Sequence, residues 1–66
     1  MSIYDFVNLL TDDAVTIAIY DYTEECEIFR GEARDAMFSD YSDYEIMAID
    51  FDGIIILNIE TDSEED

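Results

Sequence analysis

The sequence predicts a small α+β domain: a four-stranded, mainly antiparallel sheet with two short helices packed on one face. One supporting observation is that segments with helical spacing of apolar residues alternate with hairpin-like pairs of strands, in the order α-β-β-α-β-β. A second is size, because 66 residues, 50% of them hydrophobic, suffice for one core but not for two. We therefore expect a single domain over residues 1–60, followed by an acidic C-terminal tail over residues 61–66.

The first half of the chain predicts a helix followed by a hairpin. Ser2 suits the N-cap of a short helix, and Asp5 three residues later suits a capping box. Apolar residues then recur along one helical face: Ile3, Phe6, Val7 and Leu10. Residues 14–22 alternate and are rich in β-branched and aromatic side chains, which predicts a strand, and residues 26–30 predict its hairpin partner.

The second half of the chain predicts another helix and another hairpin. Gly31 interrupts the strand pattern, and residues 32–38 then favour a short helix. Residues 44–51 and 54–60 are rich in β-branched and aromatic residues and predict the third and fourth strands. The natural assembly of these elements places both helices on the same face of one sheet.

The turn between the last two strands decides which side chains share a face. Asp52-Gly53 is typical of a two-residue turn, which pairs Phe51 with Ile54. In that register five apolar side chains share a face and form a candidate dimer face: Met47, Ile49, Phe51, Ile54 and Ile56. The opposite face of this hairpin is then apolar too, and two short helices cover only one side. Either loops and tyrosines of the same chain cover the second face, or a second copy of the chain does.

Composition excludes most kinds of catalytic site. The chain has 19 acidic residues, 2 basic residues and no histidine, for a formal net charge of −17. Both basic residues are arginines, Arg30 and Arg34, so histidine-dependent triads and Schiff-base lysines are absent. The single cysteine, Cys26, cannot build a zinc site without histidine. We expect a protein that is not an enzyme and uses no metal and no cofactor.

Two segments mix carboxylates with tyrosines, the reverse of the basic and aromatic mixture that binds nucleic acid. Carboxylates on a folded scaffold can present negative charge as phosphates do, and tyrosines suit an interface centre. We expect a basic nucleic-acid-binding protein as partner, because repulsion opposes direct contact with nucleic acid or an anionic membrane. The candidate partner-binding residues are Tyr20, Asp21, Tyr22, Glu24, Glu25, Glu27, Asp40, Tyr41, Asp43, Tyr44 and Glu45. The alternative for each of them is an ordinary solvated surface or core position.

In size, acidity and these acidic-aromatic segments, the chain resembles small DNA-mimic proteins of phages and mobile elements. Anti-CRISPR proteins, anti-restriction proteins and inhibitors of uracil-DNA glycosylase belong to this class. The resemblance implies an inhibitor that blocks a nuclease, a CRISPR effector or a DNA-repair enzyme in a bacterial host cell. The alternative function is a small homodimeric protein–protein interaction module without nucleic-acid mimicry. A lone thiol and an N-terminus without basic residues favour a cytoplasmic location.

Overall fold

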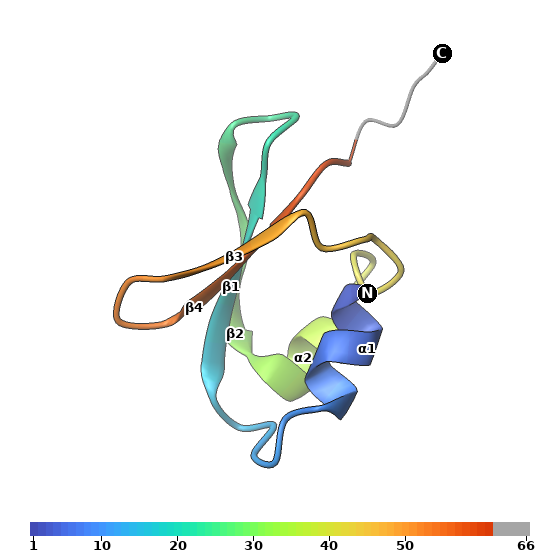
Figure 1. The fold of residues 1–66 in the computed structure, drawn as a ribbon, viewed down its shortest axis with the longest axis vertical. Coiled ribbons are helices and arrows are strands. Elements are labelled where there is room, and N and C mark those ends of the chain that lie inside the picture. The colour runs from blue at the N-terminus through green and yellow to red at the C-terminus, as the bar shows by residue number, and fades with distance from the viewer. Residues whose placement is uncertain (62–66) are drawn as a thin grey trace.

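The computed structural model describes residues 1–61, which form two helices and four strands in the predicted order (Figure 1). The elements are α1 (Ile3–Asn8), β1 (Thr16–Asp21), β2 (Cys26–Glu32), α2 (Ala33–Met37), β3 (Ala48–Phe51) and β4 (Ile55–Ile59). The predicted α+β class and element order are therefore confirmed. Of the expected acidic tail, residues 62–66 lie outside the described part of the chain.

The sheet has the strand order β2-β1-β4-β3 and is mixed rather than mainly antiparallel. The two hairpins are antiparallel, but they meet through β1 and β4, which run parallel. The physical reason is burial: the more apolar strand of the last hairpin lies in the middle of the sheet, where more of its side chains are buried than at an edge. β4 is that strand, whereas all four residues of β3 are exposed at the outer edge.

Both helices pack on the same face of the sheet, as predicted (Figure 1). The buried core joins the two central strands to the helices through Ile3, Val7, Ile17, Ile19, Ala33, Ala36, Leu57 and Ile59. The predicted capping box starts α1, because the Asp5 N–H donates to Ser2 Oγ and the Ser2 N–H donates to Asp5 Oδ2. No helix within residues 1–61 has the length and apolar character needed to cross a bilayer.

The register of the last hairpin differs from the prediction by one residue. Phe51 lies opposite Ile55 and Ile49 opposite Leu57, so residues 52–54 form a three-residue connection instead of a two-residue turn. Only Gly53 in this connection has a positive φ, at 79°, whereas a type I′ turn needs two such residues. The candidate dimer face is therefore split, because Ile56 lies opposite Asp50, on the other side of the sheet from Ile49.

The face of the sheet opposite the helices, here called the open face, mixes polar and apolar side chains. Successive side chains of a strand point to opposite faces of the sheet. Because Ile17, Ile19 and Leu57 are buried on the helical side, the residues next to them in each strand point to the open face. Its central residues are Ala18, Tyr20, Ile56, Asn58 and Asp50. The expectation that both faces of the last hairpin are apolar is wrong on this side. Asn58 is only 4% exposed, and its Nδ2 donates to the Ala48 carbonyl and to Asp50 Oδ2.

Replacing Gly53 with alanine is expected to destabilise the hairpin through the backbone alone. A Cβ added at Gly53 meets nothing within 4 Å, so the cost is that of a left-handed conformation, about 1–2 kcal/mol. Urea denaturation of G53A against the parent protein measures it. Gly53→Asn is the matched control and should lose less, because asparagine visits this conformation more readily. Equal losses for both variants would contradict this explanation.

Candidate partner-binding surface

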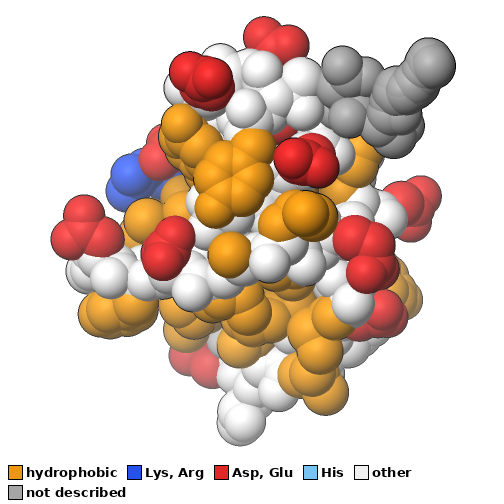
Figure 2. Space-filling model, turned by 45° about the horizontal axis from the view of Figure 1, so that its top comes forward, with side chains coloured by type: hydrophobic (Ala, Val, Ile, Leu, Met, Phe, Trp, Pro, Cys, Tyr) orange, Lys and Arg blue, Asp and Glu red, His pale blue; other side chains and the backbone are white. Residues whose placement is uncertain are grey.

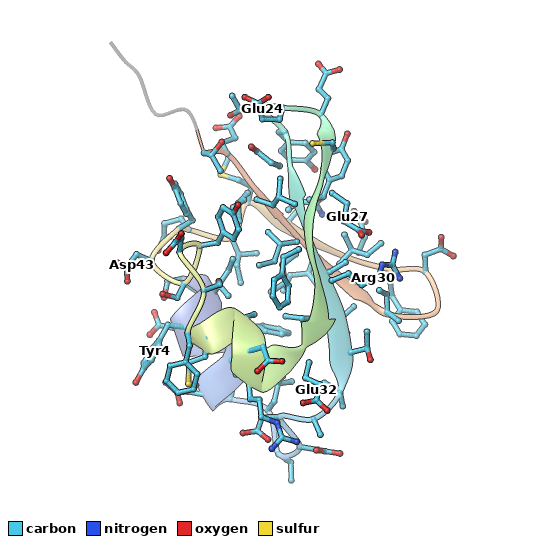
Figure 3. The ribbon with its side chains drawn as sticks, turned by 180° about the vertical axis from the view of Figure 1, so that it is seen from behind. Tyr4, Glu24, Glu27, Arg30, Glu32 and Asp43 are labelled. Atoms are coloured by element: carbon cyan, nitrogen blue, oxygen red, sulfur yellow. The ribbon has the colours of Figure 1, made fainter. Side chains whose placement is uncertain are left out.

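Carboxylates surround the fold instead of gathering on one face. Every acidic residue between positions 1 and 61 is exposed except Asp21. Figure 2 shows carboxylates separated from one another by apolar side chains on the face that it presents. In Figure 3, Glu24 lies at the tip of the β1–β2 hairpin, Glu32 lies near α2 and Asp43 lies in the loop after α2. Carboxylates therefore lie on each side of the molecule that these views show.

Both basic side chains of the chain are already engaged by carboxylates. Arg30 donates from Nε and Nη2 to the two oxygens of Glu27, at 3.0 and 2.8 Å (Figure 3). This hydrogen bond from Arg30 is the main reason that the pKa of Glu27 lies below its ordinary value. Arg34 Nε lies 3.2 Å from Glu32 Oε1 and 3.9 Å from Asp13 Oδ1. Within residues 1–61, the other exposed carboxylates thus have no arginine to offset their charge.

The end of the β1–β2 hairpin brings part of the predicted set together on one surface, where Tyr20 is half-buried and the other members are exposed. We call it the hairpin surface and define it by five residues: Tyr20, Tyr22, Glu24, Glu25 and Glu27. The rings of Tyr20 and Tyr22 meet edge to face, with centroids 5.7 Å apart and an interplanar angle of 74°. A register shift after Ile19 places Glu27 opposite Tyr20. Two tyrosines in edge-to-face contact therefore lie beside three exposed carboxylates.

The turn of this hairpin contains one residue, Glu25, with a left-handed backbone conformation. Among the described residues, Glu25 is the one non-glycine residue with a positive φ, at 56°. A residue with a Cβ seldom adopts this conformation, and such conformations cost of order 1–3 kcal/mol. Glu25 lies in the connection between β1 and β2, where a left-handed residue commonly closes a hairpin turn.

Asp21 belongs to the folded scaffold and not to the partner-binding set. Its side chain is 1% exposed, and its Oδ1 accepts from the N–H groups of Thr23 and Thr61. Its Oδ2 accepts from Thr61 Oγ1. Burial alone would raise the pKa of Asp21, but the hydrogen bonds outweigh burial and the pKa lies below its ordinary value. Asp21 therefore ties the hairpin turn to the chain that follows β4.

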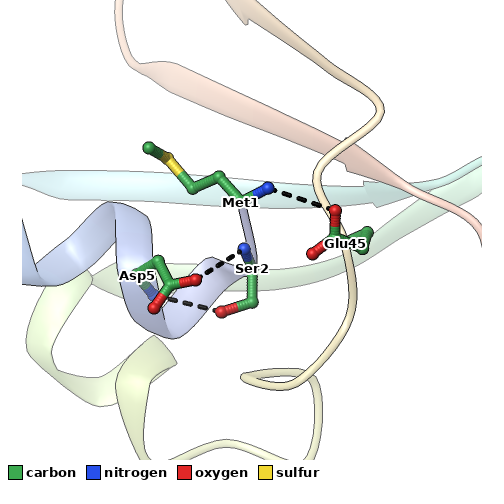
Figure 4. Close-up of polar contacts among 4 residues, drawn as sticks. All are labelled: Met1, Ser2, Asp5 and Glu45. Carbon is green, nitrogen blue, oxygen red and sulfur yellow. Dashed lines mark hydrogen bonds and ion pairs between the residues drawn. The ribbon is translucent and has the colours of Figure 1, made fainter.

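The second predicted segment, residues 40–45, divides between the core and the surface. Tyr41 and Tyr44 are half-buried and pack against the core, with ring centroids 6.3 Å apart. Glu45 accepts from the Met1 ammonium group at 3.1 Å, beside the capping box of α1 (Figure 4). Asp40 and Asp43 are exposed. This segment offers carboxylates to a partner but no fully exposed tyrosine.

Sequence reasoning did not identify two exposed apolar side chains on the helical layer. Phe38 at the end of α2 is 83% exposed, and Leu9 at the end of α1 is 69% exposed. Leu9 lies off the predicted apolar stripe, which is the signal that could have placed it on the surface. The described residues form no pocket and no group of side chains that could hold a metal ion.

Comparison of the chain with protein-family models, with curated proteins and with solved structures finds no match.

Proposed function

We propose that this protein is an acidic inhibitor that binds a basic nucleic-acid-binding protein by occupying its nucleic-acid groove. The class of target is a nuclease, a CRISPR effector or a DNA-repair enzyme of a bacterial host. The observation that carries the proposal is the hairpin surface, where exposed carboxylates flank two tyrosines in edge-to-face contact on a β-hairpin. A groove lined with lysine and arginine is complementary to such a surface.

The excess of negative charge supports the proposal in a second way. A net charge of −17 with both arginines engaged attracts a basic protein from a distance and raises the rate of encounter. The scatter of carboxylates around the fold argues against mimicry of a long duplex by one whole face. We therefore confine the mimicking contact to the hairpin surface and assign the remaining carboxylates to long-range attraction.

Matched charge removals test this assignment. Glu24→Gln with Glu25→Gln, and Asp40→Asn with Asp43→Asn, remove equal charge from two exposed segments. The assay is binding of each variant to a uracil-DNA glycosylase, a Cas9–guide complex and a nuclease, with duplex DNA as competitor. For the inhibited target we expect the hairpin pair to weaken binding at least about tenfold, or about 1.4 kcal/mol, and the loop pair much less.

Salt and competition decide whether the mechanism is mimicry. Binding should weaken steeply between about 50 mM and 0.5 M NaCl, because screening shortens the range of charge attraction. Duplex DNA should displace the protein from its target. Binding that resists salt, or that tolerates DNA in the same complex, would refute the proposal. A larger effect of the loop pair than of the hairpin pair would refute the assignment to the hairpin surface.

A homodimeric interaction module is the second candidate, and one observation favours it. Met47, Ile49 and Phe51 remain exposed by 57%, 53% and 76% although their hairpin register differs from the prediction. An apolar strip of this kind on a small protein marks a contact surface. Association through it would survive high salt, whereas the mimicry contact would not.

A further inference from the structure

β3 presents an open strand edge next to an exposed apolar strip. It is an outer strand of the sheet, and no described strand pairs with its outer edge. Met47, which leads into it, and Ile49 and Phe51 within it are all more than half exposed. The β3–β4 hairpin projects away from the helices, so the helical layer leaves this strip uncovered (Figure 1).

The other outer strand, β2, is protected in ways that β3 is not. β2 contains a register shift, and three of its four exposed positions carry charged side chains, Glu27, Arg30 and Glu32, the fourth being Cys26. Irregular pairing and charged side chains are the usual protection of a sheet edge against added strands. β3 pairs with β4 without a register shift from Ala48 to Phe51, although the Met47 N–H that precedes it also donates to the Asn58 carbonyl, and Asp50 is its one charged residue. The two edges of this sheet therefore differ in how readily they accept another strand.

The backbone of β3 is suitably oriented for pairing. The Asp52 N–H donates to the Ile54 carbonyl at 3.0 Å, which sets the alternation of hydrogen bonds along the hairpin. In an antiparallel ladder this alternation turns the N–H and C=O groups of Ile49 and Phe51 away from β4. These groups are free of the hairpin ladder and can bond a neighbouring strand.

Charge on the open face defines which strand fits. Asp50 Oδ2 accepts from Asn58 Nδ2 at 2.9 Å, and Asn58 is nearly buried, so the carboxylate is held over the open face. An added strand would meet Ile49 and Phe51 on one face and Asp50 on the other. A strand in which apolar residues alternate with lysine or arginine complements both faces at once.

We propose that β3 is the docking edge for an extended basic segment of the partner protein, which pairs with it as an added strand. This inference rests on the proposed function only in taking the partner to be basic. A second copy of this chain fits less well, because each copy carries a net charge of −17. Pairing β3 with itself would also bring acidic residues of both copies together, and like charges oppose such pairing.

The test uses the full chain and a short synthetic peptide of alternating lysine and valine. A second peptide of the same sequence carries N-methyl groups on one edge, which keeps its charge but removes its backbone donors. Nuclear magnetic resonance titration of the labelled protein follows the amides of Ile49 and Phe51. We expect the first peptide to shift these amides and the N-methylated peptide to bind at least about tenfold more weakly.

Phe51→Lys and Phe38→Lys form a matched pair, because both replace an exposed aromatic residue and change the charge equally. We expect F51K to weaken peptide binding at least about tenfold and F38K only by its general effect on charge. Equal binding of both peptides, or equal effects of both variants, would overturn the docking edge and leave only charge attraction. A dimer that persists in high salt and is lost in F51K would overturn it in favour of a second copy.

The two proposals can fail separately. Peptide pairing at β3 without any DNA-competitive inhibition would refute the proposed function and leave the docking edge in place. Inhibition that depends on Glu24 and Glu25 but not on Phe51, with no peptide pairing, would refute the docking edge alone.

Discussion

Replacing Leu57 with alanine is expected to remove a large part of the protein's free energy of unfolding at 25 °C. Leu57 is fully buried and lies between Ile19 of β1 and Ile49 of β3 in the sheet. Buried leucine-to-alanine changes cost about 2–5 kcal/mol, because they remove apolar burial and leave a cavity. A chain of this length has a free energy of unfolding of about 3–10 kcal/mol. The loss is therefore a large part of the total stability.

Leu9→Ala is the matched control, because Leu9 is 69% exposed at the end of α1. It should change the free energy of unfolding by no more than about 0.5 kcal/mol. Both variants are measured by circular dichroism in urea, since guanidinium is a salt and would screen the charge of this acidic chain. Similar losses in the two variants would show that the packing around Leu57 differs from the structure.

Replacing Asp21 with alanine is expected to have the second-largest effect. The change removes the acceptors of three hydrogen bonds, two from Thr61 and one from Thr23. Hydrogen bonds to a charged group contribute about 1.5–3 kcal/mol to stability, and alanine at position 21 cannot accept them. Asp21→Asn is the milder control, because its amide oxygen still accepts from the two N–H groups. Urea denaturation at neutral pH measures both, and an alanine variant as stable as the parent would contradict the role given to Asp21.

The Asp21 carboxylate also makes the free energy of unfolding depend on pH in a defined direction. Because the pKa of Asp21 is lower in the folded than in the unfolded protein, its stabilising contribution is fully present above its ordinary value of 3.8. The contribution is lost as pH falls through the lower pKa of the folded state. The difference in stability between the parent and D21N should therefore be constant from pH 7 to about pH 5 and shrink at more acidic pH. A difference that grows on acidification would contradict the direction of the pKa shift.

Local patterns predicted the elements well, because the interactions that start and end them lie close in sequence. The capping box of Ser2 and Asp5 spans three residues, and the structure forms it as expected. The Asp52-Gly53 signal correctly placed a hairpin but not its length. A slip of one residue moves every side chain of a strand to the other face, so this small error split the candidate dimer face.

The candidate site was only partly predictable for the same reason. The pattern of tyrosines and acids was identical in kind in the two segments, yet Tyr20 and Tyr22 lie on the hairpin whereas Tyr41 and Tyr44 pack against the core. Asp21 could not be told from its acidic neighbours, because its partner Thr61 is forty residues away in sequence. Burial and hydrogen bonds between distant residues decide which of these tyrosines and acids are available at the surface, and residue type does not.

By itself the sequence determined the order of helices and strands, the start of α1 and the excess of negative charge. These properties depend on neighbouring residues or on composition alone. Only the tertiary structure decided that β4 pairs in parallel with β1, that β3 lies open at an edge, and which carboxylate is buried. The physical reason is that burial in a shared core stabilises contacts between segments that are distant in sequence. A local pattern does not indicate which distant segments will meet.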